Sequence, residues 1–196
     1  MPTAIDIAPE TQRPDRYEVV NGKVVEIAPM SAFASEIANR LRDHLFVYAA
    51  RTNTGRTRMD MAFRLPLSED KTREREPDLA FISFARWPQE RPMRYKGQPV
   101  DVVPNIVLEV VSPTDRAEAV HAKAVEYLRA GVDLVWVIFP VIQHLYAYTT
   151  PDGAPRVYTG TDVLDGSPVL PDFTVPMAGL FPEMADEPEP ESGDDE

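Results

Sequence analysis

The strongest constraint on the fold is a pair of apolar segments that flank a helical repeat. Residues 105–112 (NIVLEVVS) and 133–139 (DLVWVIF) are runs of β-branched and large apolar residues, typical of strands buried on both faces. Between them, residues 115–130 repeat apolar side chains at helical spacing, and Gly131 suits the end of that helix. The pattern predicts an α/β fold, and 196 residues is enough for one domain with a sizeable core.

The remaining segments predict a hairpin, a second helix and further strands around this unit. Asn21-Gly22 separates two β-branched runs and is the pair that best suits a two-residue hairpin turn. Ser31 is a candidate N-cap for a helix that runs to about residue 52. Residues 56–65 alternate polar and apolar side chains as a half-buried strand does, and residues 77–83 predict a short apolar strand.

The net charge of −12 is unevenly distributed along the chain. Residues 183–196 contain eight acidic residues and no basic one, whereas residues 40–96 contain thirteen basic and eight acidic residues. The overall charge would argue against a nucleic-acid partner, because phosphates would be repelled. Since most of the excess lies in the terminal segment, the charge does not exclude such a partner for the folded part.

Other function classes are excluded by residues that the chain lacks. It has no cysteine, which excludes a disulfide framework, a thiolate zinc site and a cysteine nucleophile. It contains no glycine-rich phosphate loop, so we expect no nucleotide cofactor. The N-terminus has no apolar signal segment, and the apolar runs are too short to span a bilayer. We expect a cytoplasmic protein with no membrane association: a flexible arm (1–15), one domain (16–182) and an acidic disordered tail (183–196).

Two acidic residues occupy positions where a carboxylate is costly. Asp78 begins an apolar strand, and Glu109 lies within the apolar run of the next strand. A buried carboxylate is expensive unless it is paired or bound to a cation. Two such acids on neighbouring strands could hold a hard divalent cation such as Mg²⁺. The alternatives are that Asp78 is a turn or cap residue and that Glu109 pairs with a buried arginine.

Two helical residues are further candidates. Glu36 lies in the first predicted helix, and Lys123 lies in the helix that follows the strand of Glu109. A solvated position on an amphipathic helix is the alternative for both residues.

These residues, in this order, resemble a known family. Pro77-Asp78, then Glu109 within LEVVSPTDR, then Lys123 within KAVEYLRAGVDLVWVI, resemble the Uma-two (Uma2) family of restriction endonucleases, which belongs to the PD-(D/E)XK nuclease superfamily. The segments RYEVVNGKVVEIAPMS and GSPVLPDFTVPMAGLF also match, so the resemblance covers residues 16–181. It implies a restriction-endonuclease-like fold, in which helices flank a mixed central β-sheet, here with an N-terminal β-hairpin.

The resemblance also implies a catalytic site. Asp78 and Glu109 match the metal-binding acids, and Glu36 would help orient metal or water. Lys123 would replace the lysine that the motif places two residues after the glutamate, where this chain has Val111. Such a site hydrolyses DNA phosphodiester bonds with water activated by one or two divalent ions, Mg²⁺ or Mn²⁺.

A group of arginines supplies candidate DNA contacts, since arginine suits bidentate binding of phosphate. Its members are Arg56, Arg58, Arg64, Arg73 and Arg75. Arg56, Arg58 and Arg64 share one strand parity, so a regular strand would point them to one face. The alternative is a solvated face balanced by Glu69, Glu74 and Glu76.

The sequence therefore predicts a magnesium-dependent DNA endonuclease. A homodimer is expected from the enzyme class, because cleavage of two strands favours paired sites. The competing hypothesis is a nuclease-fold protein without catalysis that acts as a nucleic-acid-binding or assembly module. Val111 at the usual lysine position keeps this hypothesis open.

Overall fold

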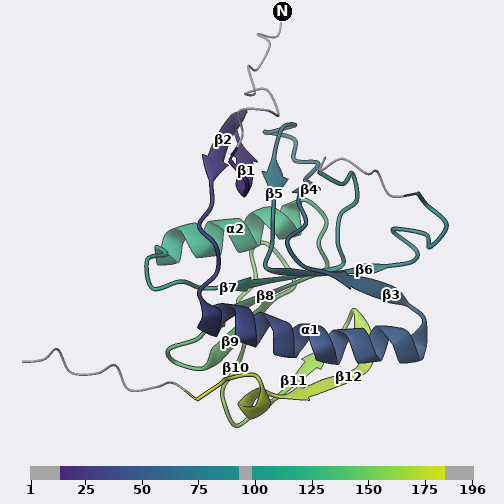
Figure 1. Ribbon diagram of the computed structural model, residues 1–196, viewed down its shortest axis with the longest axis vertical. Helices are drawn as coiled ribbons and strands as arrows, with labels where there is room; N and C mark the ends of the chain where they lie inside the picture. Colours follow the sequence, from purple (N-terminus) through teal and green to yellow (C-terminus); the bar gives the residue numbers. More distant parts are fainter. Residues whose placement is uncertain (1–13, 93–98, 184–196) are drawn as a thin grey trace, which may run out of the picture.

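A mixed six-stranded sheet forms the centre of the computed structural model, which describes residues 14–92 and 99–183 (Figure 1). Neighbouring strands are antiparallel except β7 and β8, which run parallel. In sheet order the strands are β10 (Arg156–Tyr158), β9 (His144–Tyr148), β8 (Leu134–Phe139), β7 (Ile106–Val110), β6 (Leu79–Ser83) and β3 (Gly55–Arg58).

The parallel pair explains the position of helix α2 (Ala117–Arg129). Parallel neighbours need a crossover connection, and α2 supplies it between β7 and β8. The helix ends before Gly131, whose φ of 99° is open to glycine but strained for other residues. The strand–helix–strand unit predicted from the sequence is thus confirmed.

The helices α1 (Ala32–Thr52) and α2 cover opposite faces of this sheet (Figure 1). On one face, buried residues of α1 such as Leu41 pack with Leu108 and Trp136. On the other, Tyr127 of α2 belongs to a core cluster with Val107 of β7 and with Val135 and Val137 of β8. Alternate residues of each strand enter alternate cores, which is why β8 and, apart from Glu109, β7 consist of apolar residues.

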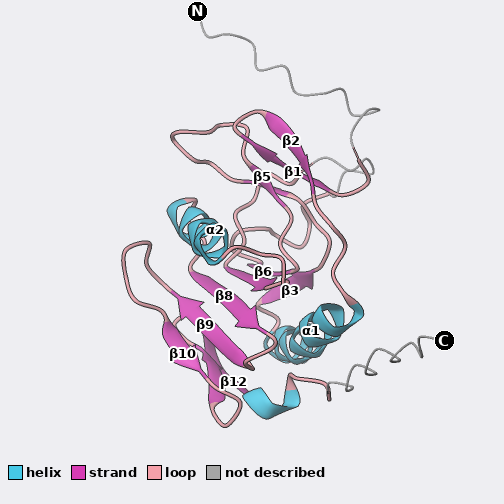
Figure 2. Cartoon of the chain, turned by 90° about the vertical axis from the view of Figure 1, so that its left-hand side faces the viewer, coloured by secondary structure: helices cyan, strands magenta, loops and turns pink. Residues whose placement is uncertain are grey.

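A smaller sheet lies on the α2 side and contains the predicted N-terminal hairpin (Figure 2). Asn21 and Gly22 form its turn with φ values of 51° and 72°, which a type I′ turn requires. Their backbone N–H groups donate to the side chains of Asp70 and Thr72, at 2.7 and 2.8 Å. In order, its strands are β2 (Lys23–Glu26), β1 (Tyr17–Val20), β5 (Glu74–Arg75) and β4 (Phe63–Arg64).

The C-terminal segment packs against the end of the molecule opposite the hairpin (Figures 1 and 2). It forms β11 (Val163–Gly166), β12 (Leu170–Pro176) and the short 3₁₀ helix η2 (Met177–Gly179). The Tyr48 hydroxyl of α1 donates to the carbonyl of Pro171, and Arg40 donates to the carbonyls of Gly179 and Phe181. These bonds fix the segment beside α1.

The continuous strand predicted over residues 56–65 is wrong: it divides into β3 and β4, which belong to different sheets, and Asp60 between them has a φ of 47°. The predicted arm (1–15) and acidic tail (183–196) fall almost entirely outside the described residues. In residues 14–92 and 99–183, no helix has the length and apolar character needed to cross a membrane.

Candidate active site

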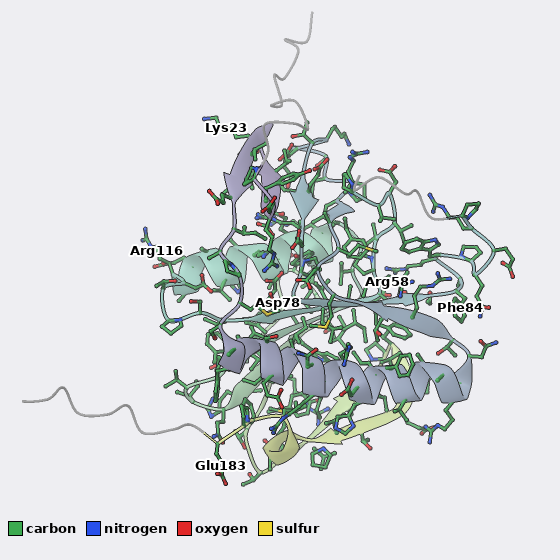
Figure 3. The ribbon with its side chains drawn as sticks, in the orientation of Figure 1. Lys23, Arg58, Asp78, Phe84, Arg116 and Glu183 are labelled. Atoms are coloured by element: carbon green, nitrogen blue, oxygen red, sulfur yellow. The ribbon has the colours of Figure 1, made fainter. Side chains whose placement is uncertain are left out.

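Asp78 and Glu109 occupy opposite positions at one end of the β6–β7 ladder. Leu79 pairs with Leu108, so the same antiparallel register places Asp78 across from Glu109. Residues directly opposite each other point to the same face of a sheet. Asp78 also accepts a 2.7 Å hydrogen bond from the backbone N–H of Val110. Figure 3 shows Asp78 at the level of the central sheet, between the two helices.

Glu109 points toward α2, which provides a partner for each of its carboxylate oxygens. Lys123 Nζ lies 2.9 Å from Oε2, and the Tyr127 hydroxyl donates to Oε1 at 2.7 Å. Lys123 and Tyr127 are four residues apart and therefore share one helix face. Because α2 packs this face over β7, a helical lysine reaches the strand acid even though Val111 occupies the motif position.

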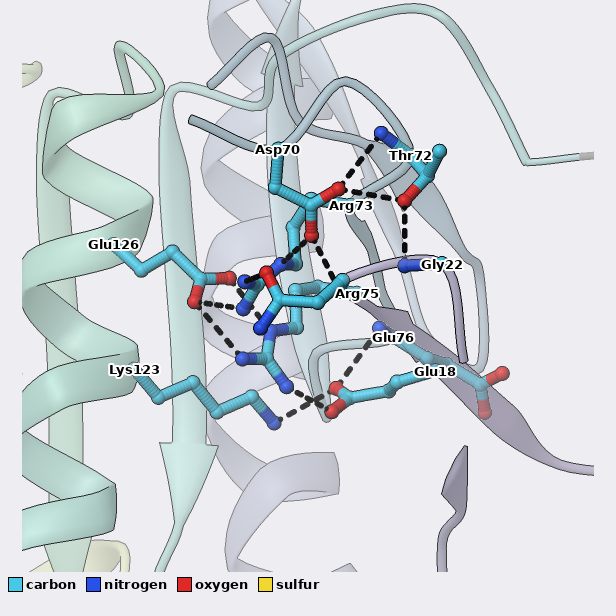
Figure 4. Close-up of polar contacts among 10 residues, drawn as sticks. Glu18, Gly22, Asp70, Thr72, Arg73, Arg75, Glu76, Lys123 and Glu126 are labelled. Atoms are coloured by element: carbon cyan, nitrogen blue, oxygen red, sulfur yellow. Dashed lines mark hydrogen bonds and ion pairs between the residues drawn. The ribbon is translucent and has the colours of Figure 1, made fainter. Parts of the chain in front are cut away.

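Glu18 of β1 is a third carboxylate in this group. Its Oε1 lies 3.0 Å from Lys123 Nζ, and its Oε2 accepts a hydrogen bond from Arg75 (Figure 4). The side chain of Glu18 is only 6% exposed. Sequence reasoning missed this residue, although it shares with Glu109 the signal of an acid beside β-branched residues. Tyr127 was recognised only as part of the apolar helix face.

The charges of this group affect one another's protonation. Burial raises the pKa of Glu109 to about 7; Lys123 opposes the rise, and the charges of Asp78 and Glu18 add to it. Burial also raises the pKa of Asp78. Burial by itself would lower the pKa of Lys123, but the nearby charges of Glu109 and Glu18 outweigh it and raise that pKa above the ordinary value. Lys123 is thus a protonated ammonium at neutral pH.

Arg73 and Arg75 belong to a buried ion-pair network rather than to a phosphate-binding surface. Arg75 Nε lies 2.7 Å from Glu126 of α2, and Arg73 contacts both Glu126 and Asp70 (Figure 4). The two arginine side chains are 13% and 9% exposed. Their guanidinium groups already bind carboxylates, so the structure does not place them for the DNA contacts expected from the sequence.

Arg56 and Arg58 have a different environment. They lie opposite Ile82 and Ala80, which share a strand parity with Asp78, so both arginines point to the sheet face of the Asp78–Glu109 pair. Neither guanidinium has an ion pair with a carboxylate of the described residues; Arg56 donates to backbone carbonyls and Arg58 to that of Thr57. Burial and the nearby Arg56 lower the pKa of Arg58.

The edge strand β3 also borders a groove of about 580 Å³ that includes Arg56 and Arg58 in its lining but lies toward α1, on the side of the sheet opposite to Asp78 and Glu109. Phe46 and Phe84 contribute apolar surface to it. Figure 3 shows Arg58 and Phe84 toward one end of the sheet, with Asp78 nearer its middle. Arg64 does not join them as the parity expectation required, because it lies on β4 and pairs with Glu74 and Asp101.

Glu36 lies apart from the residues around Glu109. It is on α1, its side chain is 49% exposed, and it forms a 2.8 Å ion pair with Arg40 one helical turn away. In the described part of the chain, no group of three or more histidine, aspartate and glutamate side chains could hold a metal ion.

Comparison with known proteins identifies the family. A family model, Uma2, described as "Putative restriction endonuclease", matches residues 5–178. The chain belongs to the Uma2 family. A solved structure described as a "putative nuclease" from Anabaena variabilis ATCC 29413 is similar with a TM-score of 0.70 at 16% identity, over 84% of this chain and 89% of that one. No curated protein matches the sequence. The predicted family and the mixed α/β nuclease fold with an N-terminal hairpin are confirmed.

Proposed function

We propose that this Uma2-family protein is an endonuclease that hydrolyses phosphodiester bonds of DNA and depends on a divalent cation. The observation that supports the proposal most strongly is the opposed pair Asp78 and Glu109, with the Lys123 ammonium 2.9 Å from Glu109. Two carboxylates at one end of the β6–β7 pair, with a lysine from α2 beside them, are the groups that metal-assisted phosphodiester hydrolysis needs.

The residues present fit Mg²⁺ or Mn²⁺, as one or two ions held by Asp78 and Glu109. Burial and mutual repulsion raise the pKa of the Glu109 carboxyl group, and a cation beside the pair would offset that excess of negative charge. Mg²⁺ usually binds one or two carboxylates and takes its other ligands from water and substrate phosphate, which suits a site with two protein ligands. When bound, such an ion would supply an activated water and Lewis-acid stabilisation of the phosphate.

The chain's own residues would perform the remaining tasks. Lys123 carries a full positive charge beside Glu109 and would stabilise negative charge on the phosphate in the transition state. Tyr127 holds one Glu109 oxygen through its hydroxyl and restricts the orientation of that carboxylate. Arg56 and Arg58 would bind DNA phosphates, since they point to the same sheet face and have no carboxylate partner in the described part of the chain.

A plasmid-nicking assay with Mg²⁺ and Mn²⁺ tests the proposal, together with calorimetry of metal binding. Wild type should nick DNA and bind the ions, whereas Asp78→Asn and Glu109→Gln should lose both properties. Asp101→Asn is the matched control, because it removes an exposed carboxylate that pairs with Arg64 on the smaller sheet. DNA binding without metal binding or nicking would instead favour a nuclease-fold binding or assembly module. Sedimentation with and without DNA tests the homodimer that we propose with this activity.

A further inference from the structure

Lys123 lies between two carboxylates that come from different parts of the fold. Glu109 belongs to the central sheet and approaches to 2.9 Å, whereas Glu18 belongs to the N-terminal hairpin and approaches to 3.0 Å. Both contacts are shielded, because the side chains of Glu18 and Glu109 are 6% and 15% exposed. The ammonium therefore has two nearly equivalent anchors.

The two anchors differ in what else they do. In the proposed function Glu109 is also a ligand of a divalent cation. Because the cation and the Lys123 ammonium are both positive, a bound cation would weaken the attraction between Glu109 and Lys123. Glu18 has no such second task. Its carboxylate is fixed by Arg75 and by the backbone N–H of Glu76, and Arg75 is itself held by Glu126.

We propose that Glu18 is a positioning residue that keeps Lys123 at the site independently of Glu109. The inference rests on the proposed function, because it concerns the lysine of that same site. Glu18 makes the hairpin a part of the active site and allows a lysine on α2 to serve where the motif lysine is absent. Lys123 then stays within reach of the scissile phosphate when Glu109 is drawn toward a cation.

A purely structural role, in which Glu18 only fastens the hairpin, predicts something different. Glu74 provides the comparison: it lies on the adjacent strand β5, opposite Val19, and its side chain is 6% exposed, as is that of Glu18. Glu74 pairs with Arg64 and, among the described residues, forms no ion pair or hydrogen bond with Lys123. If only the stability of the hairpin mattered, Glu74→Gln and Glu18→Gln would slow cleavage to a similar extent when they lower thermal stability by a similar amount.

The ammonium group can be observed directly, without metal and without catalysis. The chain has only four lysines, and a hydrogen-bonded, shielded ammonium gives a ¹H–¹⁵N signal that Lys123→Met assigns. We expect the Lys123 signal to persist in Glu109→Gln and in Glu74→Gln. It should disappear in the double variant Glu18→Gln/Glu109→Gln. Loss of the signal in Glu109→Gln alone, or its survival in the double variant, would overturn the proposal.

Single-turnover cleavage is the second measurement. Glu18→Gln should slow cleavage by about 10- to 100-fold with unchanged DNA affinity, as for other residues that orient a catalytic group. Glu74→Gln should cleave at close to the wild-type rate; equal slowing in both variants would refute the positioning role. Glu18→Asp keeps the charge beside Arg75 but shortens the reach to Lys123, so it serves if Glu18→Gln does not fold. If wild type does not cleave at all, the proposed function fails, while the ammonium signals still decide the role of Glu18.

Discussion

Glu109 should destabilise the folded protein at neutral pH, and the size of this effect can be worked out from its environment. Burial raises the pKa of Glu109 from the ordinary 4.5 to about 7, so the folded protein binds this proton more tightly than the unfolded chain does. The stability that the proton contributes is fully present below about pH 4.5 and is lost as the pH rises through about 7. Each pH unit of this interval is worth about 1.4 kcal/mol, giving about 3 kcal/mol in total.

Glu109→Gln tests this reasoning because glutamine mimics the protonated side chain at every pH. The free energy of unfolding of the variant minus that of wild type should therefore increase by about 3 kcal/mol between acidic and slightly alkaline pH. Urea unfolding at a series of pH values measures it, with the buried Trp87 and Trp136 as fluorescent probes. Comparing one difference across pH cancels any constant loss of packing or hydrogen bonding.

Glu36→Gln removes an exposed helical carboxylate, and its stability difference from wild type should stay nearly constant over the same range. Added Mg²⁺ should raise the stability of wild type above pH 7 but not that of Glu109→Gln, because a ligand stabilises only the state that binds it. A difference that does not change with pH, or that falls as the pH rises, would show that Glu109 is not held in an unfavourable buried environment.

Three further predictions concern the site and its surroundings. Tyr127→Phe leaves one Glu109 oxygen without its donor and should weaken Mg²⁺ binding by about 10- to 100-fold in calorimetry. Unchanged Mg²⁺ affinity would show that the hydroxyl does not orient the carboxylate. Arg58→Gln should weaken DNA binding uniformly and reduce the slope of log affinity against log salt by about 1, whereas Arg73→Gln should lower thermal stability instead. Deletion of residues 183–196 removes eight acids and should strengthen DNA binding at low salt; unchanged affinity there would exclude electrostatic repulsion by this segment.

The sequence predicted the central elements well because their signals are local. Because β7 and β8 pack between two cores, apolar residues occupy nearly all of their positions, and the helix period of α2 is visible between them. The hairpin was equally clear, because Asn21-Gly22 suits the positive φ values of its turn. An acid within such a strand is conspicuous, which is how Glu109 was found.

The arginines show where local reasoning fails. Parity grouped Arg64 with Arg56 and Arg58, but the left-handed Asp60 interrupts the strand and sends the chain to another sheet. The sequence around Arg73 and Arg75 resembles that around surface arginines, yet both side chains are largely buried and form ion pairs with carboxylates distant in sequence. No local pattern distinguishes a guanidinium that binds a buried glutamate from one that faces solvent.

The sequence by itself determined the family, the α/β class, and the two strand acids Asp78 and Glu109, because residue order and apolar periodicity are properties of the chain alone. Only the tertiary structure decided which side chains meet these acids. The face that α2 turns toward the sheet places Lys123 beside Glu109, and the packing of the hairpin against the rest of the fold places Glu18 beside Lys123. Both depend on packing between segments far apart in sequence, and for that reason the site's second carboxylate anchor became visible only in the folded protein.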